Sequence, residues 1–323
     1  MKYSRLGKTG INVSKISLGS ALFGLAPVET EVNPLVHRAL DLGINFFDCA
    51  NSYGNRESFD RPGMPTFDKR KSAEELLGNA LKNRRTEVVI ATKLGEQSGS
   101  NPTDKGLSRE QIFKQVEISL TRLGTDYIDI YYAHHPDPET PIEVTLEAMS
   151  DLVNQGKIRY FGLSNFNSAQ TLDTVNSSSL FPFASPVCNQ LRYNLADRQI
   201  ESEIIPICSE LNVAIIPYSP LAGGLLSGIE NTKLPIAGTQ RWRGGNSPGY
   251  SEEQVKVASQ IENMGIQWGY LPSQLAIGWL LTKPYIPSVI IGSGKTSSLE
   301  ISCSSVEMDM PEDLISELEG FTS

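Results

Sequence analysis

Four polar side chains that can hold or move a proton follow short apolar segments of the chain. They are Asp48, Tyr53, Lys93 and His134. In a parallel α/β barrel, the catalytic groups lie just past the carboxyl ends of the strands. No Ser or Cys near these positions carries a base partner, so the set indicates a proton-donor site rather than a nucleophile or a metal site.

The acid–base chemistry of these residue types predicts their roles. A hydride delivered to a carbonyl carbon leaves negative charge on the oxygen, and Tyr53 is the natural proton donor. Because a phenol ordinarily titrates near pH ~10, we expect Lys93 beside it, lowering its pKa toward the working range. We expect Asp48 to pair with Lys93 and to orient the ammonium. His134, as a neutral imidazole, is expected to donate a hydrogen bond to the substrate oxygen.

Composition narrows the class of protein. The chain has 323 residues with 39% hydrophobic content, enough for one large barrel or two ordinary domains. Its formal net charge of −9 and its pI near 5.0 argue against a nucleic-acid partner. The 4 cysteines show no C-x-x-C spacing, so we expect reduced thiols rather than a metal site or disulfides.

The N-terminus and the apolar runs predict the cellular location of the protein. Residues 1–10 are polar, without the apolar region of a signal peptide. No apolar stretch reaches the roughly 18 residues of a membrane span. We therefore expect a soluble, cytoplasmic protein with no membrane partner.

Four predicted helices begin with the same motif, the capping box. The boxes are Ser72–Glu75, Ser108–Gln111, Thr140–Glu143 and Ser251–Gln254. Apolar residues then return at helical spacing, as in Ile142, Leu146, Met149 and Val153. Each helix is expected to bury one stripe.

Between the helices lie short, uniformly apolar runs that are typical of parallel strands covered on both faces. They are 15–18, 44–47, 88–92, 127–133, 157–163, 184–189, 213–217 and 288–291. Eight runs, most separated by one helix, predict an α/β fold, a closed (β/α)8 TIM barrel with residues 1–323 in a single domain. Two long segments, 55–71 and 221–250, follow strand ends and are predicted to form walls or lids of the active site.

Several motifs, in this order, resemble the aldo-keto reductases. They are GINFFD (43–48), ANSYG (50–54), ATK (91–93), AHHPD (133–137), GKIRYFGLSN (156–165) and YSPLAGGLL (218–226). The opening SRLGKTG (4–10) resembles the branch of bacterial, fungal and plant members that includes the potassium-channel β subunits. The resemblance runs from Tyr3 to about Glu319. It implies a barrel that binds a nicotinamide cofactor without a Rossmann fold, in agreement with the lack of a G-x-G-x-x-G motif here.

By this resemblance the family's catalytic tetrad is Asp48, Tyr53, Lys93 and His134. His134 and His135 compete for one position, since strand alternation points only one of them inward. The family pattern, apolar-His-x-Pro-Asp, selects His134. The implied activity is an NADP(H)-dependent reduction of an aldehyde or ketone to an alcohol, with Tyr53 as proton donor.

The resemblance also places the cofactor. It assigns Ser164, Asn165 and Gln190 to the nicotinamide carboxamide and Tyr218 to the face of the nicotinamide ring. The loop that follows would hold the pyrophosphate through Ser219, Leu221 and Gly223.

A second phosphate region, with Gly292, Gly294 and Lys295, follows the eighth strand and opens a helix. It superficially resembles a P-loop, but that pattern needs Gly where Val289 stands. Lys295 is predicted to meet an adenosine 2′-phosphate, which favours NADPH, with NADH possible.

The residues at the positions predicted to bind the adenosine depart from the family pattern. Ser298, Ile301 and Ser302 stand where relatives usually carry Gln, Glu and Asn, so the adenine contacts are expected to be weaker. Arg241 is a further candidate phosphate contact, and a solvated loop arginine is the alternative.

The substrate is expected to be a small carbonyl compound, with Tyr193, Trp242 and the 55–71 segment as pocket walls. Two other functions stay open. One is an NADPH-binding interaction or sensor subunit without turnover, as in the channel β subunits. The other is a Schiff-base aldolase using Lys93. The sequence selects neither the individual substrate nor the oligomeric state.

Overall fold

Eight parallel strands form the centre of the protein, as seen in a computed structural model that describes residues 1–54, 56–60, 62–181, 185–230 and 249–321. They are β3 (Ile16–Gly19), β4 (Phe46–Asp48), β5 (Val89–Leu94), β6 (Ile128–Ala133), β7 (Ile158–Ser164), β8 (Cys188–Arg192), β9 (Ala214–Tyr218) and β10 (Val289–Gly292). The sheet runs in the order β10-β3-β4-β5-β6-β7-β8-β9, and β9 also contacts β10. The predicted (β/α)8 barrel is confirmed.

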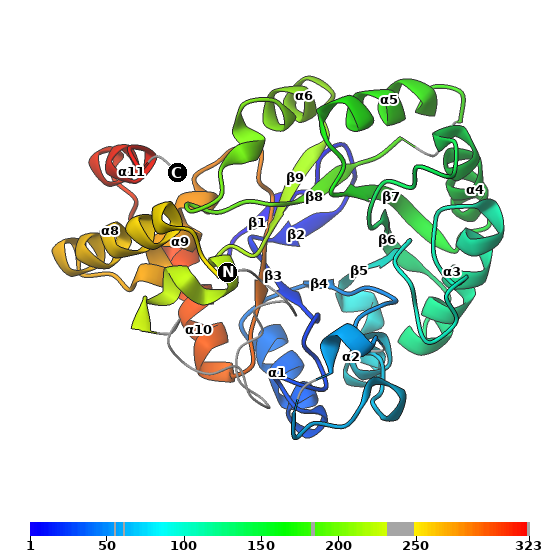
Figure 1. Ribbon diagram of the computed structural model, residues 1–323, viewed down its shortest axis with the longest axis horizontal. Coiled ribbons are helices and arrows are strands. Elements are labelled where there is room, and N and C mark those ends of the chain that lie inside the picture. The colour runs from blue at the N-terminus through cyan, green and yellow to red at the C-terminus, as the bar shows by residue number, and fades with distance from the viewer. Residues whose placement is uncertain (55, 61, 182–184, 231–248, 322–323) are drawn as a thin grey trace.

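Helices surround this barrel on the outside (Figure 1). They are α1 (Glu29–Asp41), α2 (Ala73–Leu81), α3 (Arg109–Leu123), α4 (Ile142–Asn154), α5 (Ser168–Ser178), α6 (Ile204–Glu210), α8 (Glu252–Trp268), α9 (Pro272–Leu281), α10 (Thr296–Ser304) and α11 (Glu312–Glu319). An antiparallel hairpin, β1 (Tyr3–Arg5) and β2 (Asn12–Ser14), precedes the barrel. Its Leu6 and Val13 pack into the barrel interior with residues from the strand starts, so the hairpin covers the amino end.

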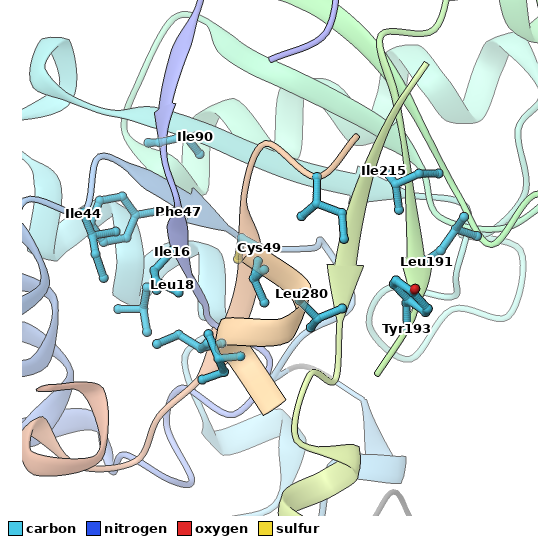
Figure 2. Packing of buried hydrophobic residues seen from close by; sticks show 14 of the residues in the cluster. Ile16, Leu18, Ile44, Phe47, Cys49, Ile90, Leu191, Tyr193, Ile215 and Leu280 are labelled. Atoms are coloured by element: carbon cyan, nitrogen blue, oxygen red, sulfur yellow. The ribbon is translucent and has the colours of Figure 1, made fainter. Parts of the chain in front are cut away.

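The core has two parts, separated by the wall of strands. Phe46 belongs to the cluster inside the barrel, whereas its neighbour Phe47 belongs to the larger cluster between the strands and the helices. Figure 2 shows members of this outer cluster, among them Phe47, Ile90 and Ile215. Successive side chains of a strand point to opposite faces, so the interior receives every second residue. This alternation decides which polar residues reach the active site.

The helix caps agree with the sequence in part. Full capping boxes form at Ser72 and Ser251, and the Ser108 hydroxyl accepts a hydrogen bond from the Gln111 amide. The box predicted at Thr140 is wrong: α4 begins at Ile142 with Pro141 as its N-cap. The Thr140 hydroxyl instead donates to Asp137 Oδ2 at 2.7 Å, because that carboxylate closes the preceding turn.

Of the run predicted over 184–189, the described residues 185–187 precede the strand, which begins at Cys188; Pro186 has no amide proton for the ladder. All four cysteines are free thiols and buried, as expected. Within the described ranges, no helix combines the length and the apolar character that crossing a bilayer requires.

Candidate active site

The carboxyl ends of the strands form one end of the barrel, here called the barrel mouth. Because side chains alternate between the two faces of each strand, the polar residues at the strand ends point into this mouth. On β4 the inward Phe46 is followed two positions later by Asp48, and on β5 the inward Ala91 is followed by Lys93. On β6 the inward Tyr132 is followed by His134, which lies just past the strand end. The same spacing carries Gln190 on β8 and Tyr218 on β9 to this end. Residues far apart in sequence therefore meet because each is two positions beyond an inward core residue.

Lys93 is fully buried at the centre of this group. Its ammonium donates hydrogen bonds to Asp48 Oδ1 at 2.6 Å, to the Cys49 carbonyl oxygen at 2.8 Å and to the Tyr53 hydroxyl oxygen at 3.2 Å. Burial alone would lower the pKa of Lys93, but the Asp48 carboxylate and Tyr53 outweigh it and raise the pKa above its ordinary value. Lys93 is therefore a charged ammonium paired with Asp48, as the sequence predicted.

Tyr53 stands on the loop after β4, with its ring edge-on to Phe59 of the 55–71 segment at 6.2 Å between centroids. Its backbone carbonyl accepts a hydrogen bond from the Ala73 amide at the start of α2. The expected fall in its pKa is not found. Burial is the larger effect and raises the pKa of Tyr53 to about 12, although the Lys93 charge acts in the lowering direction. Tyr53 is thus a protonated phenol in this structure.

His134, rather than His135, faces Tyr53. The two rings lie 5.8 Å apart in an edge-to-face arrangement, and His134 is 7% exposed. Burial and the Lys93 charge lower the pKa of His134 to about 3, so its imidazole is neutral. The His135 side chain is 49% exposed and stacks on His134 with centroids 5.0 Å apart.

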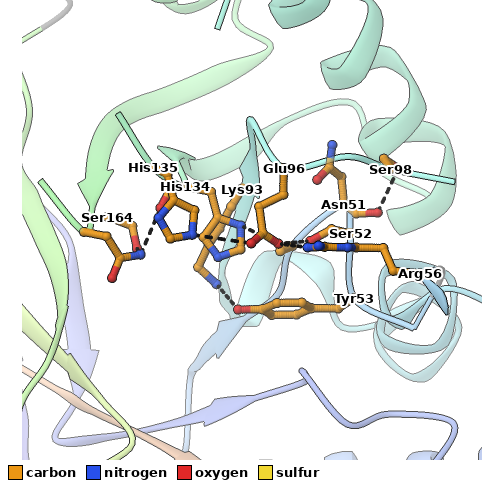
Figure 3. Close-up of polar contacts among 12 residues, drawn as sticks. Asn51, Ser52, Tyr53, Arg56, Lys93, Glu96, Ser98, His134, His135 and Ser164 are labelled. Carbon is orange, nitrogen blue, oxygen red and sulfur yellow. Dashed lines mark hydrogen bonds and ion pairs between the residues drawn. The ribbon is translucent and has the colours of Figure 1, made fainter. Parts of the chain in front are cut away.

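Sequence reasoning missed Glu96, which follows β5 and lies beside both histidines (Figure 3). Its carboxylate accepts hydrogen bonds from Ser52 at 2.8 Å and from Arg56 at 2.6 Å. Burial acts to raise the pKa of Glu96, but the hydrogen bond from His135 and the Arg56 charge outweigh it and lower the pKa, so the group is ionised. A signal was present in the sequence: an acidic residue three positions after Lys93, near an arginine in the adjoining long loop.

The residues predicted to hold the nicotinamide form one hydrogen-bonded group. Gln190 Nε2 donates to Asp48 Oδ2 at 2.7 Å, and the Tyr218 hydroxyl donates to Asn165 Oδ1 at 2.9 Å. The Asn165 amide nitrogen in turn donates to Ser164 Oγ at 3.1 Å and to the His134 carbonyl at 3.0 Å. The bond to Asn165 fixes the plane of the Tyr218 ring beside the tetrad, which fits a flat contact with a nicotinamide.

The loop after β9 has a backbone suited to an anion. Ser219, Ala222, Gly223 and Gly224 all have positive φ, between 47° and 90°. Such turns orient neighbouring amide groups toward one side, as anion-binding nests do. The half-buried Leu221 and the 3-10 helix η5 (Ala222–Ser227) complete this segment.

Strand β10 ends at Gly292 at the same end of the barrel, and the loop after it contains Gly294. Helix α10 begins there without a side-chain cap, so its first amide groups stay available to a phosphate. Lys295 and Ser298 are exposed at this helix start. The residues present therefore fit a nicotinamide dinucleotide with its phosphates at these two loops.

Three further residues were predicted to contribute to the site. Arg241 and Trp242 lie outside the described residues. Tyr193 is not a pocket wall: it is fully buried, its hydroxyl donates to Glu201 Oε1 at 2.6 Å, and its ring packs against Trp279. Its place is the core because it lies past the end of β8, where the chain turns outward toward α6.

Known proteins resemble the chain over nearly its whole length. A sequence model of the Aldo/keto reductase family matches residues 15–322. A probable voltage-gated potassium channel subunit beta of Arabidopsis thaliana is 31% identical over 95% of this chain and 92% of its own. The uncharacterized oxidoreductase YrpG of Bacillus subtilis is 32% identical over 98% of this chain and 94% of its own. The chain therefore belongs to the aldo/keto reductase family.

Proposed function

We propose that the protein reduces an aldehyde or ketone to the alcohol with NADPH. The observation that carries this proposal is the contact of the Lys93 ammonium with both Asp48 and the Tyr53 hydroxyl at the barrel mouth. A bound nicotinamide supplies the hydride that adds to the carbonyl carbon. The protein's own groups then have to supply one proton to the carbonyl oxygen.

Tyr53 supplies that proton. Its O–H bond breaks as the new O–H bond of the alcohol forms, and the phenolate left behind lies 3.2 Å from the Lys93 ammonium. A positive charge at this distance in buried surroundings stabilises the phenolate strongly. Asp48 keeps Lys93 charged and aimed at Tyr53, and water returns a proton to Tyr53 after the product leaves. His134, which is neutral, borders the same space and orients the substrate.

The geometry of the loops supports the proposed cofactor positions. Ser164, Asn165 and Gln190 would hold the carboxamide, and Tyr218 would cover one face of the ring. Ser219, Leu221 and Gly223 would hold the pyrophosphate, with Gly292 and Gly294 on the opposite loop. Lys295 would pair with the 2′-phosphate, and Ser298 would lie near the adenosine.

The direct test is NADPH oxidation, followed by absorbance, with a panel of small aldehydes and ketones. We expect steady-state turnover with at least part of the panel. NADPH that binds tightly but is not consumed by any carbonyl compound would contradict the proposal.

A sensor subunit is the second candidate, since several relatives of this chain carry the name of potassium channel β subunits. In that case bound NADPH would be oxidised once and then exchanged slowly. A single-turnover experiment separates the two: fast chemistry followed by slow cofactor release favours the sensor, whereas rapid repeated turnover favours the reductase.

The geometry disfavours a Schiff-base aldolase. The three N–H bonds of Lys93 point at Asp48, Cys49 and Tyr53, and the pKa of Lys93 is raised, so no free amine is present to attack a carbonyl. Borohydride treatment in the presence of carbonyl substrate should leave the mass of the protein unchanged.

A further inference from the structure

The loop that carries Tyr53 is fixed at Asn51, two positions before the proton donor. Asn51 is fully buried, and its backbone amide donates a hydrogen bond to the Lys93 carbonyl oxygen at 3.0 Å. Its own carbonyl oxygen accepts from Ser98 Oγ at 3.0 Å (Figure 3) and from Arg122 Nη1 at 3.1 Å. The loop is therefore tied to the backbone of the lysine that contacts Tyr53, and the position of Asn51 limits where the Tyr53 hydroxyl can lie.

Helix α3, on the outside of the barrel, holds Asn51 with two side chains. Gln115 and Arg122 stand about two turns apart on α3, so both lie on one face of the helix. Gln115 Oε1 accepts a hydrogen bond from Asn51 Nδ2 at 3.1 Å, and Arg122 donates to the Asn51 carbonyl oxygen. Asn51 is therefore held from outside the barrel through both its side chain and its backbone.

Arg122 is itself supported by a buried carboxylate. Its Nη1 also donates to Oε2 of Glu74, on α2, at 3.4 Å, and Glu74 is fully buried. The other carboxylate oxygen of Glu74 accepts from the hydroxyl of Thr92, the residue before Lys93 on β5, at 2.6 Å. Burying a pair of ionisable groups gains little stability compared with apolar packing of the same volume. Fold stability alone therefore does not account for this pair between two helices.

A glycine brings the two helices close enough for this contact. Gly78 lies one turn after Glu74 on the same face of α2. A Cβ atom at Gly78 would lie 2.5 Å from the Leu123 carbonyl oxygen and 2.7 Å from that of Arg122. These distances are too short for any side chain, so this close approach of α2 and α3 requires glycine. The approach fixes the end of α3 that carries Arg122 against Glu74.

We propose that Arg122 is a positioning residue, which through Asn51 keeps the Tyr53 hydroxyl at its place in the barrel mouth. This inference rests on the proposed reductase function. The place is 3.2 Å from the Lys93 ammonium, which stabilises the phenolate that proton transfer leaves. A misplacement of about 1 Å can cost about 100-fold in rate. The residues proposed to bind the nicotinamide lie at the ends of β7, β8 and β9, so cofactor binding should not depend on Arg122.

The first test is carbonyl reduction by Arg122→Met and Arg122→Lys, each compared with the unaltered protein at equal concentrations of folded protein. In Arg122→Met we expect kcat to fall about 10- to 100-fold, with the dissociation constant for NADPH unchanged. Lysine keeps the charge but has one nitrogen in place of the arginine fork, so Arg122→Lys should restore part of the rate. An unchanged kcat in Arg122→Met would overturn the proposal.

Arg85→Met is the matched control. Arg85 donates to the buried Asp129 carboxylate at 2.7 Å, near the amino end of β6 and therefore at the opposite end of the strands from Tyr53. Both arginines support a buried carboxylate, so both substitutions should lower the free energy of unfolding. We expect kcat to fall in Arg122→Met and to stay unchanged in Arg85→Met. An equal loss of kcat in the two variants would mean that lower stability is the cause and would overturn the proposal.

Hydrogen exchange tests the positioning role without turnover. The amides of Cys49 and Asn51 donate to the Ala91 and Lys93 carbonyl oxygens at 2.8 Å and 3.0 Å. In Arg122→Met these amides should exchange about tenfold faster than in the unaltered protein and in Arg85→Met, the value of one hydrogen bond. Equal exchange would overturn the proposal. Faster exchange in a protein that reduces no carbonyl compound would refute the reductase function while supporting the hold of Arg122 on the loop.

Arg122→Lys gives the same comparisons if Arg122→Met does not fold. We expect a smaller loss of kcat and a smaller rise in the exchange rate of the Asn51 amide, because the lysine nitrogen cannot hold Glu74 and Asn51 with the geometry of the arginine fork. Unchanged kcat together with unchanged exchange in Arg122→Lys would overturn the proposal.

Discussion

Gln190 donates a 2.7 Å hydrogen bond to Oδ2 of Asp48, whose other oxygen accepts from Lys93 at 2.6 Å. The two residues are 142 positions apart in sequence and lie on opposite sides of the barrel mouth, on β8 and β4. Through this bond the residue proposed to hold the nicotinamide carboxamide also satisfies the carboxylate that supports the proton donor. The proposed binding of the nicotinamide and the proposed proton transfer therefore both depend on the buried Asp48 carboxylate.

Asp48→Asn should destabilise the fold strongly. It removes the charge that balances Lys93, which is fully buried, and breaking one side of a buried ion pair typically costs about 3–5 kcal/mol. The measurement is the free energy of unfolding in urea. Glu87→Gln, which breaks the exposed pair with Arg84, is the matched control and should change it little. Equal stability of Asp48→Asn and the unaltered protein would mean that Lys93 is neutral.

Tyr53→Phe should abolish carbonyl reduction while leaving the protein folded. Loss of a general acid costs about 10²- to 10⁴-fold in rate, and the phenyl ring keeps the contact with Phe59. Steady-state kcat and NADPH affinity are measured together, and only kcat should fall. Tyr270→Phe, which removes a hydroxyl bonded to Asp309 on the surface, is the control. Full activity in Tyr53→Phe would assign the proton to another group.

The pH dependence of reduction should be flat near neutrality. Tyr53 must be protonated to act, and its pKa of about 12 keeps it so, while His134 with a pKa of about 3 stays neutral. We therefore expect kcat/KM for reduction to be constant from about pH 5 to about pH 9. Alcohol oxidation needs the deprotonated Tyr53, so its rate should rise with pH. A fall in reduction with a midpoint near pH 6.5 would show that His134 titrates.

Lys295→Ala should weaken NADPH much more than NADH. A charged contact to a phosphate is worth about 1.5–3 kcal/mol, so NADPH should lose about tenfold or more in affinity, and NADH should change little. Fluorescence titration of each cofactor gives the two dissociation constants. Lys82→Ala, at the exposed end of α2, is the control. Equal losses for both cofactors would place the 2′-phosphate elsewhere.

Much of the site could be predicted from sequence because strand alternation is a local property. Lys93 and His134 each follow an inward core residue at a spacing of two, which is visible in a linear reading of β5 and β6. Thr140 shows the limit of such local patterns. Its capping box looked complete, but the side chain of Asp137 offered its hydroxyl a partner outside the helix.

The apolar runs and the helix starts by themselves predicted the barrel, because both depend on periodicity within a few residues, and the family motifs selected the four candidate residues of the tetrad. Only the tertiary structure decided how those residues act. The pKa values of Tyr53 and His134 depend on how deeply the packed barrel buries each side chain and on the nearby Lys93 charge. Burial and through-space charge are properties of neighbours in three dimensions, and the order of residues along the chain does not specify them.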